Sequence, residues 1–220
     1  MLRLIIFDWD GTLHDTAQRI ITSMRNAAAD MNMPQPHDKS VRQIIGLELA
    51  EAIRQIFPSL LPEQMDQMQK LFSQFCTASQ VPMPIFPGVE TTLQHLKKCG
   101  TLLAVATNKT RPGLNRHIRE LGWEALFHYT RCADEAPSKP NPQMILDVCK
   151  ALNVSTAEAL MVGDTTYDLE MAYAIGMPSV GVLYGAHSRQ QLEKFNPRAL
   201  IQNFSELLAI CHNDISPPEK

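Results

Sequence analysis

The sequence has no hydrophobic run that approaches the roughly 20 apolar residues of a membrane-spanning helix. Its N-terminal apolar run is broken at Asp8, too early for the hydrophobic region of a secretory signal peptide. The 220 residues include five scattered cysteines, and none of them forms a C-x-x-C pair. This argues against a disulfide framework or a zinc site and fits a reducing compartment. We therefore expect a soluble, cytoplasmic protein with no membrane partner.

An excess of positive charge is also missing. The chain carries 20 lysines and arginines against 23 aspartates and glutamates, a net charge of −3, and it has no basic cluster. Nucleic acid is therefore not an expected partner. There is no internal repeat or low-complexity tract, and this length can hold one core, or one core with a small inserted domain. The sequence leaves open whether the protein is a monomer or a homodimer.

The residues around which the chain is organised are Asp8-Trp9-Asp10-Gly11-Thr12, directly after the apolar run 2–7. Such a run is typical of a parallel strand buried on both faces. Alternate strand residues point the same way, so Asp8 and Asp10 would leave the carboxyl end together. Two crowded carboxylates need a cation, and Gly11 allows a sharp turn that brings backbone N–H groups close to an anion. The pattern suits a carboxylate nucleophile, an acid/base partner and a hard metal ion; a simple polar turn is the alternative.

Helical spacing of apolar residues replaces strand patterns between two expected hinges, near Asp15 and at residues 82–84. Four helices in this segment would form a small bundle. They are expected from about residue 16 to before Pro34, from a cap at Asp38 or Ser40 to Ile45, over 47–57 and over 62–79.

Helices and strands alternate after the second hinge, which predicts β-α-β units. Strands are expected at 101–106, 129–132, 159–162, 179–182 and 199–201. Helices are expected at 89–98, 112–121, 142–152 and 204–211, and a further helix is expected to end at residue 175.

Polar residues follow three of these strands. The hydroxyl of Thr107 and the N–H groups that enter the next helix could hold a phosphate oxygen, although a turn or cap role is the alternative. Lys139 lies in a proline-rich loop, where a lysine is usually solvated. Asp164 and Asp168 follow a strand one helical turn apart, and both could merely favour a positive helix N-terminus.

Taken in order, these motifs resemble the four motifs of the haloacid dehalogenase superfamily. D-x-D-G-T-L begins at Asp8, Thr107 ends the second strand, K-P-x-P begins at Lys139, and G-D-x-x-x-D covers residues 163–168. The resemblance implies an α/β fold with a doubly wound, mostly parallel, Rossmann-like sheet, helices on both faces and an inserted all-helical cap. The implied division is a core of residues 1–14 and 84–212, a cap of residues 15–83 and a flexible tail of residues 213–220.

The function that the resemblance implies is Mg²⁺-dependent hydrolysis of phosphomonoesters through an aspartyl-phosphate. Asp8 would be the nucleophile and Asp10 the general acid and base. Mg²⁺ would be bound by Asp8, the Asp10 carbonyl and Asp164, with Asp168 orienting the ligands. The implied phosphate-binding groups are those of Thr107, Asn108, Lys139 and Gly11. Because haloacid dehalogenases lack the second aspartate and the metal, Asp10 argues against dehalogenation.

The segment Val41-Arg42-Gln43-Ile44-Ile45-Gly46 resembles the cap of phosphoglycolate phosphatase-like members, where V-R-x-x-I-G faces the substrate. It makes Arg42 and Gly46 candidate specificity residues; a solvated surface arginine is the alternative for Arg42. The implied substrate is a small phosphate ester, with phosphoglycolate favoured. A phosphosugar mutase similar to β-phosphoglucomutase and a non-catalytic phosphate-binding regulator are the other hypotheses.

Overall fold

A parallel β-sheet forms the centre of the computed structural model, which describes residues 2–212. Within these residues the sheet has six strands in the order β3-β2-β1-β4-β5-β6, all paired in parallel. The strands are β1 (Leu4–Phe7), β2 (Leu102–Thr107), β3 (Tyr129–Cys132), β4 (Ala159–Gly163), β5 (Ser179–Val182) and β6 (Ala199–Ile201). The predicted parallel α/β fold is confirmed.

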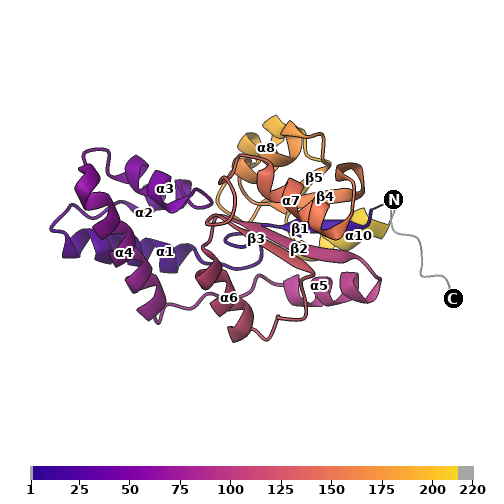
Figure 1. Cartoon of the computed structure of the whole chain (residues 1–220), viewed down its shortest axis with the longest axis horizontal. Helices are drawn as coiled ribbons and strands as arrows, with labels where there is room; N and C mark the ends of the chain where they lie inside the picture. Colours follow the sequence, from indigo (N-terminus) through magenta and orange to yellow (C-terminus); the bar gives the residue numbers. More distant parts are fainter. Residues whose placement is uncertain (1, 213–220) are drawn as a thin grey trace.

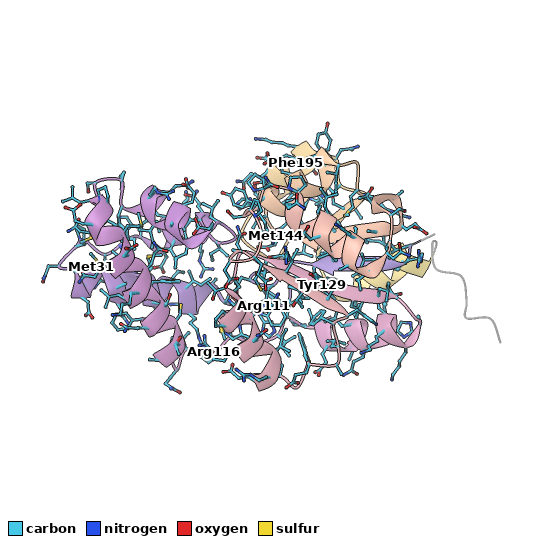
Figure 2. All side chains as sticks on the ribbon, viewed as in Figure 1. Met31, Arg111, Arg116, Tyr129, Met144 and Phe195 are labelled. Atoms are coloured by element: carbon cyan, nitrogen blue, oxygen red, sulfur yellow. The ribbon has the colours of Figure 1, made fainter. Side chains whose placement is uncertain are left out.

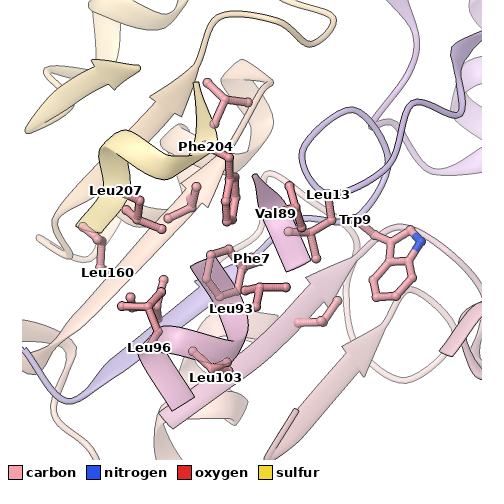
Figure 3. Close-up of a cluster of buried hydrophobic side chains, with 14 of the residues drawn as sticks. Phe7, Trp9, Leu13, Val89, Leu93, Leu96, Leu103, Leu160, Phe204 and Leu207 are labelled. Atoms are coloured by element: carbon pink, nitrogen blue, oxygen red, sulfur yellow. The ribbon is translucent and has the colours of Figure 1, made fainter. Parts of the chain in front are cut away.

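Each central strand supplies side chains to two separate hydrophobic clusters, one on each face of the sheet. In β1, Ile5 and Phe7 join one cluster, whereas Leu4 and Ile6 join the other. This is the consequence of side chains that alternate along a strand buried on both faces. Figure 3 shows the first cluster, where Phe7 lies among leucines from the neighbouring strands and helices and Trp9 lies at the edge, beside Leu13.

Helices cover both faces, as expected for a doubly wound sheet. One face is covered by α5 (Val89–Lys98), α6 (Arg111–Glu120) and α10 (Leu207–His212), and the other by α7 (Gln143–Leu152) and α8 (Thr166–Ala174). A short helix, α9 (Arg189–Leu192), lies between β5 and β6 and was not predicted. Within the described residues, no helix has both the length and the apolar character needed to cross a membrane.

Four helices lie at one end of the molecule, beyond the sheet, and Met31 marks their far side (Figures 1 and 2). They are α1 (Ala17–Asp30), α2 (Asp38–Gln43), α3 (Leu49–Ile56) and α4 (Pro62–Ala78). A third hydrophobic cluster, built around Met24, Ile53 and Met68, belongs to these helices alone. We call α1–α4 the helical bundle.

Two segments connect the bundle to the sheet, and they lie side by side. The Asp15 N–H donates to the Pro84 carbonyl at 2.9 Å, and His14 pairs with Ile85 in an antiparallel bridge. The predicted hinge positions are therefore adjacent in space.

Two local details differ from the sequence-based expectation. The N-cap of α2 is His37, so neither Asp38 nor Ser40 caps this helix; Asp38 lies in its first turn, where a carboxylate favours the helix dipole. The last predicted helix begins as a 3₁₀ turn, Phe204–Glu206, before α10. The predicted tail, residues 213–220, lies outside the described residues.

Candidate active site

The polar residues of the four motifs meet at the carboxyl edge of the sheet. The Phe7 position of β1 pairs with Val105 of β2 on one side and Val162 of β4 on the other. The residues that follow these three positions, including Asp8 and Asp164, therefore leave the same sheet edge. Ligands in open parallel sheets bind at this edge.

Trp9 explains why the two flanking aspartates face the same way. Its indole ring is fully buried and stacks on the imidazole of His14, with ring centroids 5.0 Å apart. Because neighbouring side chains of an extended segment point in opposite directions, Asp8 and Asp10 are directed to the other side. Both line a cavity between the sheet edge and the helical bundle.

A buried lysine connects two motif aspartates. The Lys139 ammonium forms ion pairs with Asp8 Oδ1 and with Asp168 Oδ1, the latter at 2.6 Å, and its side chain is inaccessible to solvent. The second oxygen of Asp168 accepts hydrogen bonds from the N–H and hydroxyl of Thr165, at 3.1 and 2.7 Å. Both oxygens of Asp168 are thus engaged, and this carboxylate holds Lys139 in position.

Asp164 lies in a close-fitting pocket of backbone and hydroxyl donors. Thr12 Oγ1 donates to its Oδ1 at 2.9 Å, and the Ala186 N–H donates to its Oδ2 at 2.8 Å. Two glycines leave room for this carboxylate: a Cβ on Gly11 would lie 2.3 Å from Oδ2, and one on Gly185 would lie 2.2 Å from the Asp164 Cβ. Gly185 and Ala186 were not predicted from the sequence.

Gly11 differs from its predicted role as a phosphate ligand. Its N–H donates to the His14 carbonyl at 2.8 Å, so this donor closes the turn and is not offered to an anion. Its backbone has φ +89°, which a residue with a side chain rarely adopts. The glycine allows the close approach of Asp164.

The carboxylates form a site that fits a cation. One ligand oxygen from each of Asp8, Asp164 and Asp168 lies within 4.8 Å of the others, and Asp8 Oδ2 is a buried acceptor without a partner. Burial raises the pKa of Asp164 to about 7, and the charge of Asp168 adds to the shift. Burial also raises the pKa of Asp8, although Lys139 opposes this. A hard divalent cation with oxygen ligands would relieve this repulsion.

Asp10 has a partner that the sequence analysis did not assign. Both its carboxylate oxygens accept from Lys109 Nζ at 2.8 Å. Burial is the largest influence and would raise the pKa of Asp10, but the charge and hydrogen bonds of Lys109, with smaller contributions from His117 and Thr16, together lower it. His117 is buried beside this pair, and burial together with the Lys109 charge lowers its pKa to about 3. Its ring is therefore neutral at physiological pH.

The loop after β2 supplies the other predicted phosphate-binding residues. Thr107 is buried at the end of β2, and its hydroxyl accepts from the Lys109 N–H at 3.2 Å. Asn108 Oδ1 accepts from the Lys139 N–H at 3.2 Å, and Asn108 Nδ2 donates to the Gly46 carbonyl at 2.8 Å. The structure thus brings Thr107, Asn108 and Lys139 together beside Asp8.

The cavity has a volume of about 320 Å³, with the sheet edge on one side and the bundle on the other. Gly46, one of the two candidate specificity residues, lines it. Arg42 does not: it is exposed on α2, whereas its neighbour Val41 is buried in the core of the bundle. Val41 faces inward on this short helix, so Arg42 is directed to solvent. This agrees with the alternative interpretation of Arg42 as a solvated surface arginine.

Comparison with known protein families agrees with this geometry. Residues 5–182 match the family model described as haloacid dehalogenase-like hydrolase. The chain belongs to this family. The resemblance found in the four motifs is confirmed.

Relatives and solved structures resemble the protein over nearly its whole length. A probable phosphatase IndB of Dickeya dadantii (strain 3937) is 36% identical over 219 residues, covering 96% of this chain and 94% of the relative. A phosphoglycolate phosphatase of Psychrobacter arcticus is 27% identical, covering 94% of both. The crystal structure of a predicted phosphoglycolate phosphatase from Haemophilus somnus 129pt has a TM-score of 0.87 at 26% identity, covering 95% of this chain and 97% of that one.

Proposed function

We propose that the protein is a Mg²⁺-dependent phosphatase that cleaves small organic phosphate monoesters through an aspartyl-phosphate on Asp8. The observation that carries this proposal is the buried Asp8 carboxylate, which faces the cavity between Lys139 and Asp164 and keeps one oxygen unpartnered. A carboxylate in this setting can attack phosphorus, and the surrounding groups can balance the charge that gathers there.

Each step of the reaction uses a residue of the site. The Asp8 carboxylate attacks phosphorus, the bond to the leaving oxygen breaks, and Asp10 gives that oxygen a proton. Water then attacks the phosphorus and gives a proton to Asp10, so that the Asp8–phosphorus bond breaks and phosphate leaves. Lys109 helps to lower the pKa of Asp10 despite burial, so the ionised form predominates; this form accepts the proton in the second step, and the protonated form acts in the first. Thr107, Asn108 and Lys139 stabilise the charge on the transferring group.

The metal that we propose is Mg²⁺, with Asp8, Asp164 and the Asp10 carbonyl as protein ligands. The donors are all oxygens, which favours a hard cation over zinc. When bound, Mg²⁺ would screen the repulsion between the Asp8 carboxylate and the phosphate. Asp168 would not bind the metal directly; it would orient the site through its contacts with Lys139 and Thr165.

We also infer that residues 15–83 are a cap domain on a core of residues 1–14 and 84–212. The separate hydrophobic cluster of the bundle and the paired linkers support this division. Enclosure by such a cap would exclude water from the reacting groups. A mutase would need polar groups in the cap to hold a sugar; the bundle lines the cavity mainly with apolar side chains and contributes few such groups, including Ser73 and Thr77.

Phosphate release from a set of phosphomonoesters, measured with and without excess chelator, tests the proposal. The relatives' names make phosphoglycolate one substrate to include. We expect release that depends on Mg²⁺ and is lost in Asp8→Asn. Isomer formation without release would indicate a mutase, binding without turnover a regulatory protein, and full activity in chelator would contradict the proposed site.

A further inference from the structure

We propose that the substrate carries an apolar leaving group, an alkyl or aryl alcohol without a charged end, which binds against the helical bundle. This inference rests on the proposed function and specifies its substrate class. It rests on the position of the cavity relative to Asp8, on the side chains that line it, and on the partners of the cations around it.

The direction of attack places the leaving group. In phosphoryl transfer the attacking and leaving oxygens lie roughly in line with phosphorus. Asp8 leaves the sheet edge and lines one side of the cavity, and residues of the bundle line the opposite side. A phosphoryl group held by Thr107 and Lys139 therefore directs its leaving oxygen, and the group attached to it, towards the bundle.

The bundle side of the cavity is predominantly apolar. Its lining comes from three helices and the turn between α2 and α3; α4 contributes the polar side chains Ser73, Cys76 and Thr77, and the apolar members include Ile20, Met24, Ile44, Leu47, Leu49 and Phe72. The Met24 and Ile44 side chains are buried, at 0% and 6% exposure, so this wall is continuous with the hydrophobic cluster of the bundle. A charged leaving group placed against the buried Met24 and Ile44 would lose its hydration without gaining a charged partner from these side chains.

The cationic residues around the cavity already have partners. Lys109 is paired with both oxygens of Asp10. Among the described residues, Arg19 is the one charged side chain that the bundle contributes to the lining, and its Nε donates to the Val81 carbonyl at 2.8 Å. Arg116, on the side of α6 that faces the bundle (Figure 2), donates from Nη1 to Thr77 Oγ1 at 3.0 Å.

The two arginines remain partly open to solvent. Arg19 and Arg116 are partly exposed, as are Leu47 and Phe72 of the apolar wall, whereas Met24 is buried. Arg42 lies outside the cavity. A carboxylate such as that of phosphoglycolate has no unpaired buried cation opposite it among the described residues.

A series of linear alkyl phosphates tests the inference. The leaving alcohols from ethanol to hexanol differ little in acidity, so kcat/KM in the presence of Mg²⁺ reports binding of the chain. We expect kcat/KM to rise roughly threefold to fivefold per methylene until the cavity is filled. Propyl phosphate should also be a better substrate than phosphoglycolate, which is similar in size but ends in a carboxylate.

Two leucine variants show where the chain binds. Leu47→Ser removes a partly buried side chain from the cavity wall and should flatten the dependence on chain length. Leu61→Ser is the matched control, because Leu61 is 52% exposed, lies outside the lining and precedes α4 at a position that serine favours. It should leave the chain-length dependence unchanged.

Binding of alkylphosphonates, measured by calorimetry, separates the two proposals. Their carbon–phosphorus bond is not hydrolysed by a phosphatase, so binding of the alkyl chain can be measured without turnover. Affinity that rises with chain length, without phosphate release from any ester, would contradict the phosphatase and support the apolar site. Release from the esters with no dependence on chain length, or a preference for phosphoglycolate over propyl phosphate, would overturn the apolar site alone. A rise with chain length that persists in Leu47→Ser and disappears in Leu61→Ser would also overturn it.

Discussion

The side-chain Nδ2 of Asn108 donates a 2.8 Å hydrogen bond to the carbonyl oxygen of Gly46. This contact joins the loop after β2 to the turn after α2, and so joins the sheet edge to the helical bundle. Gly46 has φ +93°, and a Cβ there would lie 2.8 Å from Thr165 Cγ2. The contact between the bundle and the sheet edge therefore depends on a residue without a side chain.

Substitution of Gly46 should disturb this contact. We expect Gly46→Ala to lower kcat/KM by on the order of tenfold to a hundredfold, because small displacements of positioning groups reduce rates strongly. Steady-state kinetics measures this. Thr165→Ser, in the same background, removes the obstructing methyl group and keeps the hydroxyl that donates to Asp168 at 2.7 Å. It should restore part of the activity, and a Gly46→Ala variant with normal kinetics would contradict the role of this contact.

Lys139 should stabilise the fold as well as the reaction. Burial would lower its pKa, but the charges of Asp168 and Asp8 outweigh burial and raise it, so the ammonium stays charged. Without metal, Lys139→Met should lose about 3–5 kcal/mol of the free energy of unfolding, since it leaves two buried carboxylates without their cation. Urea denaturation in chelator measures the loss. Lys150→Met, on the exposed side of α7, is the control, and equal stability of the two variants would be incompatible with this ion pair.

Gly185 should control metal affinity without touching the nucleophile. A Cβ there would lie 2.2 Å from the Asp164 Cβ, so Gly185→Ala must displace this carboxylate. We expect a higher Mg²⁺ concentration for half-maximal activity, measured by titration of the chelator-treated enzyme. At Gly176 a Cβ would meet nothing within 4 Å, and asparagine tolerates the left-handed backbone, so Gly176→Asn should leave the requirement unchanged. An unchanged requirement in Gly185→Ala would remove Asp164 from the proposed metal ligands.

Most of the sheet could be predicted because its strands are short apolar runs that end at turn residues. The bounds of β3, β5 and β6 agree with the predicted ranges. Asp8, Lys139 and Asp164 could be selected because each lies in a motif at the end of a strand or in the loop that follows one. Because the carboxyl ends of parallel strands lie at one edge of a sheet, motifs placed at these ends were expected to meet there.

The missing parts of the site are contacts that leave no local pattern. The Ala186 N–H reaches Asp164 from 22 positions further along the chain, and a backbone donor carries no side-chain signal. Lys109 pairs with Asp10 across 99 positions. The orientation of Arg42 depends on how the short helix α2 packs, and six residues do not define an apolar face clearly.

His117 should make stability depend on pH. Its pKa is lowered to about 3 in the fold, by burial first and by the Lys109 charge, and is about 6.5 in an unfolded chain. As pH falls through 6.5, the unfolded chain binds a proton that the folded chain does not, so stability decreases from there towards pH 3. His117→Gln should therefore lose less stability between pH 7.5 and 5.5 than the natural protein, as measured by urea denaturation.

The exposed His37 provides the control for that comparison. His37→Gln should retain the pH dependence of the natural protein. If His117→Gln and His37→Gln show the same loss on acidification, the neutral state of the His117 ring does not contribute to stability.

The central claim is that Asp8 forms the covalent intermediate and Asp10 transfers protons, and a burst experiment with nitrophenyl phosphate tests it most directly. Nitrophenolate barely needs protonation, so Asp10→Asn should still be phosphorylated, but its intermediate should break down slowly because no base activates water. We expect a burst of nitrophenol near one equivalent per enzyme in Asp10→Asn, with a phosphoryl group on the peptide that contains Asp8 after acid quenching. Asp8→Asn should give neither burst nor phosphopeptide. A burst in Asp8→Asn, or an Asp10→Asn phosphopeptide that lacks Asp8, would contradict the account.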